Sequence, residues 1–162
     1  MVGMPGGGLN ICVEALDRHL GSSRAEHVAI RWLAAHGAME EISFSLLARR
    51  ANCFTNVLQS LGLKRGDRLF LLAPRAPDLY VGVLGALRAG IIVAPMFSAF
   101  DPESIATRMN LGAGTALLTT QTLYRRKVEA VRLKIPSLQH VLLIDADPLA
   151  LPQSCINTYV YD

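Results

Sequence analysis

Four short apolar runs alternate with three helical segments over residues 68–144, and this alternation constrains the fold more than any other feature of the sequence. Nearly continuous apolar strands are typical of a sheet that is covered on both faces. Strands separated by helices predict a parallel sheet with right-handed crossovers. The expected strands are residues 68–73, 91–94, 115–119 and 140–144, and the expected helices are residues 77–89, 102–111 and 122–133. The predicted fold class is therefore α/β, with a mostly parallel sheet flanked by helices.

The first third of the chain predicts a small hairpin between two helices. Asn10 is a suitable cap for a short helix that reaches residue 20. Residues 27–33 and 41–44 have the composition of strands, and Gly37 marks the turn between them. A longer helix follows, with Ser43 or Ser45 as its cap and Gly62 at its end. Its apolar face is formed by Leu47, Ala51, Phe54, Leu58 and Leu61.

The length of 162 residues fits one ordinary α/β domain, and 51% hydrophobic residues are enough to form its core. We expect a flexible N-terminus at residues 1–9 and an α/β lobe at residues 10–145. Residues 146–162 have no regular period and carry two prolines, so we expect a linker toward a missing second lobe.

Charge and cysteine content narrow the function. The 16 Lys and Arg residues against 13 Asp and Glu give a net charge of +3, and most of the basic residues are scattered, which argues against a nucleic-acid partner. No apolar run approaches the length of a membrane span. The three cysteines are far apart, as is usual for free thiols in a reducing cytoplasm, where we expect this protein.

Open parallel sheets bind ligands at the carboxyl ends of their strands. Residues 96–100 connect one expected strand to a helix, and small residues there allow a ligand close to the backbone. The N-terminus of that helix favours an anion, but Asp101 as its cap would compete with a phosphate. A structural turn and a ligand-binding loop both fit this segment.

Three further groups follow the other strands. Arg125, Arg126 and Lys127 lie in the first turns of a helix, where they fit either a phosphate site or a solvated basic face. Thr119 and Thr120 offer hydroxyl groups, and residues 145–147 carry two carboxylates that fit Mg²⁺ poorly without further acids. The standard glycine-rich phosphate motifs and the nucleophile elbow are absent from the sequence.

The order of these segments resembles AMP-forming acyl-CoA synthetases of the acetate–CoA ligase type. Residues 10–20 resemble the family's opening segment, and residues 61–68 are similar to the turn before its first core strand. Residues 77–95 resemble its next helix and strand. Residues 97–103 resemble the acetate–CoA ligase variant in particular, and the resemblance extends over residues 10–145.

This resemblance implies a two-step reaction. A carboxylate attacks the α-phosphate of ATP, and coenzyme A then displaces AMP from the acyl-adenylate. The parent enzyme would use a small carboxylic acid, ATP, Mg²⁺ and coenzyme A. Its protein groups would orient the reactants and neutralise phosphate charge.

The resemblance also implies where coenzyme A would contact this chain. Phe97, Ser98 and Ala99 match an aromatic–Gly–Gly segment of the family, with Ser98 and Ala99 in place of the glycines. Residues 124–127 match an Arg-Gly-Gly-Lys segment, where Tyr124 replaces the arginine. The implied cofactor-binding residues are therefore Phe97, Ser98, Ala99, Arg125, Arg126 and Lys127.

The family's phosphate loop, acyl pocket and catalytic lysine have no counterpart here. We therefore expect the isolated chain to be inactive, to bind no cofactor tightly, and to self-associate through an exposed lobe surface. A stand-alone regulatory or binding module is the alternative. Continuation of the sequence into a Gly- and Thr-rich loop with a lysine would favour the enzyme.

Overall fold

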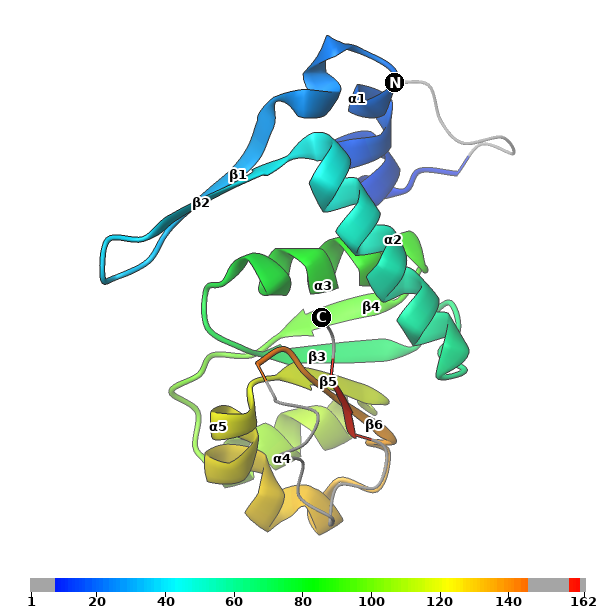
Figure 1. Ribbon diagram of the computed structural model, residues 1–162. Helices are drawn as coiled ribbons and strands as arrows, with labels where there is room; N and C mark the ends of the chain where they lie inside the picture. The colour runs from blue at the N-terminus through cyan, green and yellow to red at the C-terminus, as the bar shows by residue number, and fades with distance from the viewer. Residues whose placement is uncertain (1–7, 146–157, 161–162) are drawn as a thin grey trace. The chain divides into compact units, whose positions relative to one another are not determined.

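The computed structural model describes residues 8–145 and 158–160, which form two compact units (Figure 1). The first unit combines the described chain up to Gly62 with Ala76–Gly90, and the second combines Leu63–Arg75 with the described chain from Ile91 onward. The chain thus leaves the second unit after one strand and returns to it before the next.

The first unit contains short helical segments, an antiparallel hairpin and two longer helices. Its elements are η1 (Val13–Asp17), α1 (Arg18–Leu20), η2 (Ser23–Glu26), β1 (Val28–Leu33), β2 (Met39–Ser43), α2 (Phe44–Ser60) and α3 (Pro77–Arg88). The expected hairpin is confirmed, with Leu33 opposite Met39 beside the turn. Gly37 has a φ of +89° in that turn, a conformation that glycine adopts without steric cost.

Helix α2 packs on α3 at a close contact (Figure 1). The Ser43 hydroxyl caps α2 by accepting from the Leu46 amide, and Gly62 ends it with a φ of +82°, as predicted. Gly85 of α3 lies against α2, where a Cβ atom would be 2.8 Å from the Ala51 carbonyl oxygen. The Thr55 hydroxyl donates to the carbonyl oxygens of Ala51 and Gly85, so it adds a polar contact between the helices.

The N-terminal helical segment is fastened to the end of α3. The Asn10 side-chain oxygen accepts from the Cys12 amide at 2.9 Å, which confirms the predicted cap. The Asn10 amide group also donates to the Leu87 carbonyl at 3.0 Å. Arg88 donates to both carboxylate oxygens of Asp17, at 2.6 and 2.8 Å. The Asn10 amide is thus a second donor to the Leu87 carbonyl, which also accepts from the Gly90 amide, and the Arg88–Asp17 ion pair adds a charged contact at the same helix end.

The second unit is built on a parallel sheet in the order β4-β3-β5-β6-β7. Its elements are β3 (Arg68–Leu72), β4 (Ile92–Pro95), α4 (Pro102–Leu111), β5 (Ala116–Thr119), α5 (Gln121–Leu123), η3 (Tyr124–Val128), η4 (Glu129–Lys134), β6 (His140–Leu143) and β7 (Thr158–Val160). The four predicted strands and their parallel pairing are confirmed, and so is the α/β class. Among the described residues, no helix is long and apolar enough to cross a membrane.

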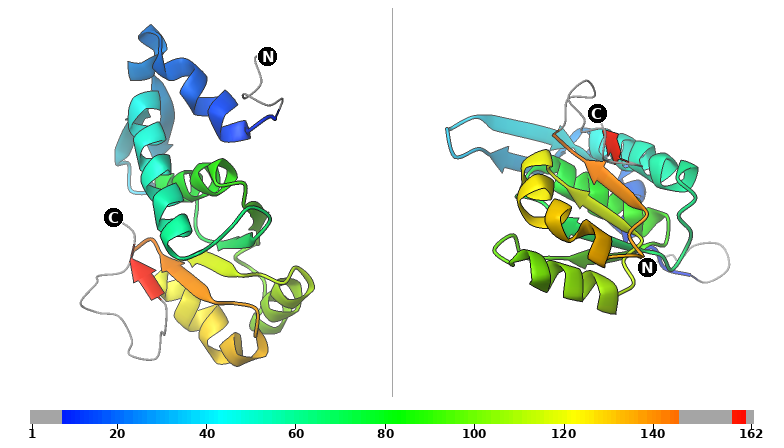
Figure 2. Two further views of the ribbon diagram at one scale, coloured as in Figure 1. Left: turned by 90° about the vertical axis from the view of Figure 1, so that its right-hand side faces the viewer. Right: turned by 90° about the horizontal axis from the view of Figure 1, so that it is seen from below.

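One face of this sheet is covered by α4 and by the helical segment α5–η4 (Figures 1 and 2). Both connections move in the same direction across the sheet, and right-handed crossovers then place them on the same face. The core between them includes Phe70, Leu117 and Val141 from the strands. Side chains of the opposite parity, such as Leu69 and Leu118, are also fully buried, which explains the apolar character of these strands.

The structure differs from the expected elements in three places. The helix expected at residues 10–20 contains the π-helical turn η1. The expected helix at residues 122–133 is a short α-turn, a π-helical turn and a 3₁₀ turn. The wide and tight turns offset each other, so Tyr124, Val128 and Val131 still share the buried side. The expected linker at residues 146–162 contains β7, whereas residues 146–157 and 161–162 lie outside the described residues, as do residues 1–7 of the expected flexible N-terminus.

A tight connection between α4 and β5 surrounds the ring of Phe70. A Cβ atom on Gly112 or Gly114 would lie 2.7 Å from that ring, so the backbone approaches it too closely for a larger residue. Arg68 donates to the carbonyl oxygens of Gly112 and Ala113, at 2.9 and 2.7 Å. Ala113 is left with a φ of +46°, the one non-glycine residue with positive φ in the described chain.

We expect Ala113→Gly to stabilise the protein by about 0.5–1 kcal/mol, because a left-handed alanine costs more than the extra freedom of glycine in the unfolded chain. Ala89→Gly is the matched control, because Ala89 ends α3 with a φ of −73° and should lose stability instead. The urea midpoint of both variants tests this expectation. A lower midpoint for Ala113→Gly would contradict it.

We expect Gly85→Ala to destabilise the protein by about 1–3 kcal/mol, because the added methyl group meets the α2 backbone and Phe54. Gly21→Ala is the control, since a Cβ there meets no atom within 4 Å. Urea denaturation measures both changes. Equal midpoints for the two variants would show that α2 and α3 separate easily.

Candidate functional site

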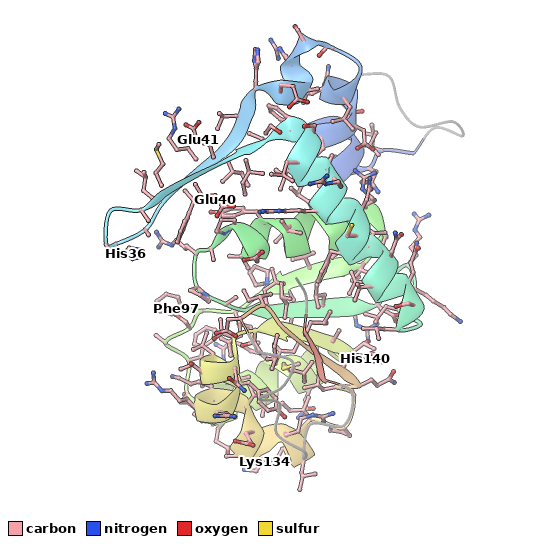
Figure 3. The ribbon with its side chains drawn as sticks, viewed as in Figure 1. His36, Glu40, Glu41, Phe97, Lys134 and His140 are labelled. Atoms are coloured by element: carbon pink, nitrogen blue, oxygen red, sulfur yellow. The ribbon has the colours of Figure 1, made fainter. Side chains whose placement is uncertain are left out.

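The candidate site lies at the carboxyl edge of the sheet in the second unit, where the segments after β4 and β5 meet. Figure 3 shows Phe97, just after β4, at one end of the strands and His140, the first residue of β6, at the other. Burial lowers the pKa of the His140 imidazole. Its place at the amino end of β6 separates His140 from the candidate site.

Residues 97–100 form a tight turn between β4 and α4. The Phe100 amide donates to the Phe97 carbonyl at 3.0 Å, and Ser98 and Ala99 are the exposed residues inside the turn. The Phe97 side chain is 67% exposed. Its ring meets the edge of the Phe100 ring with 6.1 Å between centroids and an interplanar angle of 80°. The turn therefore presents an aromatic side chain to solvent.

The N-terminus of α4 is occupied by its own cap. The Asp101 carboxylate accepts from the Ser104 amide at 2.9 Å and from the Ser104 hydroxyl at 2.6 Å. These hydrogen bonds lower the pKa of the Asp101 carboxyl. A negative group already fills the position where the helix would hold an anion, as the sequence predicted.

The predicted basic residues occupy the π-helical turn η3. Tyr124 is buried in the core and contributes packing. Arg125 and Arg126 are exposed, and neither has a hydrogen-bond or ion-pair partner within the described part of the chain. They are available to an anion from solution.

Lys127 brings the two predicted segments together. Its ammonium group donates to the Phe100 carbonyl at 2.8 Å, across 27 residues of sequence. The structure thus joins the aromatic turn to η3, and we call the combined set the aromatic–basic surface. It consists of Phe97, Ser98, Ala99, Arg125, Arg126 and Lys127.

The other polar groups at this edge serve the fold. The Thr119 hydroxyl is buried and donates to the Leu72 carbonyl at 2.6 Å, and the Thr120 hydroxyl accepts from the Leu123 amide. The Asp145 carboxylate accepts from the Gln121 amide at 2.7 Å. Each of these side chains thus has a structural role in the described chain.

The described residues do not assemble a metal centre. No three His, Cys, Asp or Glu side chains of residues 8–145 and 158–160 lie close enough together to hold a metal ion. Asp145 acts as a cap, and Asp147 lies outside the described residues. The carboxylate set that Mg²⁺ prefers is therefore not formed by this part of the chain.

Sequence reasoning missed Arg108, which supports the aromatic turn. The Arg108 guanidinium lies 3.9 Å from the centroid of the Phe100 ring, in a cation–π contact. The spacing of eight residues between an aromatic residue and an arginine on the following helix was the available signal. The spacing alone does not show that the turn folds back on α4 and brings the Phe100 ring to Arg108.

Residues 17–159 match the protein family described as AMP-binding enzyme. The chain is 35% identical over 158 residues to the acetyl-coenzyme A synthetase of Bacillus subtilis, a match that covers 96% of this chain and 26% of that protein. It is 38% identical over 118 residues to the acetyl-coenzyme A synthetase of Syntrophus aciditrophicus, covering 70% of this chain and 18% of that protein. The chain thus spans about a quarter or less of the length of these relatives.

Solved structures agree with the sequence relatives. An acyl-CoA synthetase from Brucella canis is 29% identical with a TM-score of 0.77, and the match covers 94% of this chain and 27% of that one. An anthranilate CoA ligase, AuaEII, is 22% identical with a TM-score of 0.73, and the match covers 83% of this chain and 25% of that one. This second similarity supports the fold. With the parallel sheet, these matches lead to one conclusion: this chain belongs to the family of AMP-binding enzymes.

Proposed function

We propose that this chain is the N-terminal part of an acetate or short-chain acyl-CoA ligase. The parent would convert a carboxylate, ATP and coenzyme A into acyl-CoA, AMP and pyrophosphate, with Mg²⁺ neutralising phosphate charge. The observation that carries this proposal is the 35% identity to an acetyl-coenzyme A synthetase along 96% of the chain. The fold agrees, because the Brucella canis acyl-CoA synthetase has a TM-score of 0.77 over 94% of the chain.

The contribution proposed for this part of the enzyme is binding. The aromatic–basic surface combines an exposed ring, an exposed turn and two exposed arginines that have no partner among the described residues. Coenzyme A carries phosphates that suit guanidinium groups, and an adenine ring and methyl groups that suit an aromatic ring. We therefore assign coenzyme A to this surface and the reacting groups of the enzyme to residues beyond those described.

Two further properties belong to the same proposal. The widely spaced cysteines support a cytoplasmic location. Exposed apolar side chains such as Leu33 and Met39 support self-association of the isolated chain.

The activity is tested by a chimera in which this chain replaces the matched 158 residues of the Bacillus subtilis enzyme. We expect AMP release that depends on both acetate and coenzyme A, because the matched fold should restore the missing surface. The isolated chain should release no AMP under the same conditions. A folded but inactive chimera, with folding checked by circular dichroism, would contradict the proposal, and so would turnover by the chain alone.

We expect the double substitution Arg125→Gln and Arg126→Gln in the chimera to raise KM for coenzyme A by about 10-fold, because two exposed ion pairs of up to ~1 kcal/mol each together reach the ~1.4 kcal/mol of a tenfold change. The KM for ATP should stay unchanged. Arg65→Gln is the control, since Arg65 is an exposed arginine in the turn before β3. Initial-rate measurements decide, and an unchanged KM for coenzyme A would remove the arginines from the proposed surface.

A further inference from the structure

Phe100 holds the aromatic turn at three separate points. Its amide closes the turn on Phe97 at 3.0 Å, and its ring lies under the guanidinium of Arg108 at 3.9 Å. Its carbonyl oxygen accepts from the Lys127 ammonium at 2.8 Å. The ring also packs on the core of the second unit. The conformation of the turn thus depends on groups outside it.

Among the described residues, Lys127 supplies the hydrogen bond to Phe100 that comes from the next crossover. Arg108 lies on α4, directly after the turn, whereas Lys127 belongs to η3, which follows β5. A charged donor on a carbonyl oxygen gives a stronger hydrogen bond than a neutral donor. The ammonium therefore ties the connection after β4 to the connection after β5.

We propose that Lys127 is a positioning residue, which holds the aromatic turn in place and leaves anion contact to Arg125 and Arg126. This assignment rests on the proposed coenzyme A surface. Its basis is the division of the three cations: Lys127 is bound to the Phe100 carbonyl, while Arg125 and Arg126 are exposed and have no partner in the described chain. A turn that is already ordered loses less conformational freedom when a ligand binds.

The first test measures the turn itself, without any ligand. Hydrogen exchange followed by NMR on the 162-residue chain compares wild type with Lys127→Met. We expect the Phe100 amide to exchange about 10-fold faster, because the turn opens more often without the hydrogen bond from Lys127. The amides of β3 and β5 should keep their exchange rates. Lys127→Arg should restore part of the protection, and Lys64→Met is the control at an exposed lysine.

Two results of this test would overturn the assignment. An unchanged exchange rate at Phe100 would show that the turn does not need Lys127. Equal acceleration at every amide would show a general loss of stability. Neither result depends on what the enzyme does, so the role of Lys127 in ordering the turn is tested separately from the proposed activity.

The second test uses the salt dependence of coenzyme A binding in the chimera. Removing a cation that touches a phosphate weakens the dependence of KM on ionic strength, because screening then acts on fewer charge pairs. We expect Lys127→Met to raise KM for coenzyme A about 5-fold with the salt dependence unchanged, and Arg125→Gln with Arg126→Gln to reduce that dependence. A reduced dependence for Lys127→Met would overturn the assignment by making Lys127 a direct contact. A chimera without coenzyme A-dependent turnover would instead refute the proposed function. The hydrogen-exchange result would still decide whether Lys127 orders the turn.

Discussion

Burial of β3 between two parallel neighbours is the constraint on which the second unit depends. Its four residues from Leu69 to Leu72 are at most 6% exposed, so the strand needs cover on both faces. In a parallel sheet each connection must carry the chain from the carboxyl end of one strand back to the amino end of the next. All strands therefore end on the same side of the sheet. That requirement brings the segments after β4 and β5 together, although they are separated by about one helix and one strand. The aromatic–basic surface is a consequence of this topology.

Much of the fold could be predicted because its signals are local. The helix ends carry the expected residue types. Helices α2 and α4 begin at the caps Ser43 and Asp101, and Gly62 and Gly90 follow the ends of α2 and α3 with positive φ. The four strands were visible as apolar runs. The change from π to 3₁₀ geometry at residues 124–134 was not visible, because the buried side of the segment has the same spacing that an α-helix would have.

The candidate site was predictable only in part. The strand ends marked the correct edge of the sheet, yet they did not reveal which polar groups were already bound. Thr119 and Asp145 find partners 47 and 24 residues away, and such distant pairs leave no trace in a local pattern. The same holds for Lys127, whose partner is a backbone carbonyl, a group that every residue carries. Periodicity and composition could locate the basic residues on a helical segment. They could not show that Lys127 is hydrogen-bonded to a carbonyl while Arg125 and Arg126 are exposed to solvent.

The π-helical geometry of η3 limits how this surface can vary. A π turn contains more residues than an α turn, so removal of one residue from Tyr124–Val128 would convert the segment toward an ordinary helix. The later residues, such as Val131, could keep their side toward the core, because the residue removed is the extra one of the wide turn. The positions of the three cations within the turn would change instead. The length of this short segment, as much as its charge, therefore determines where the arginines lie relative to the lysine that contacts the aromatic turn.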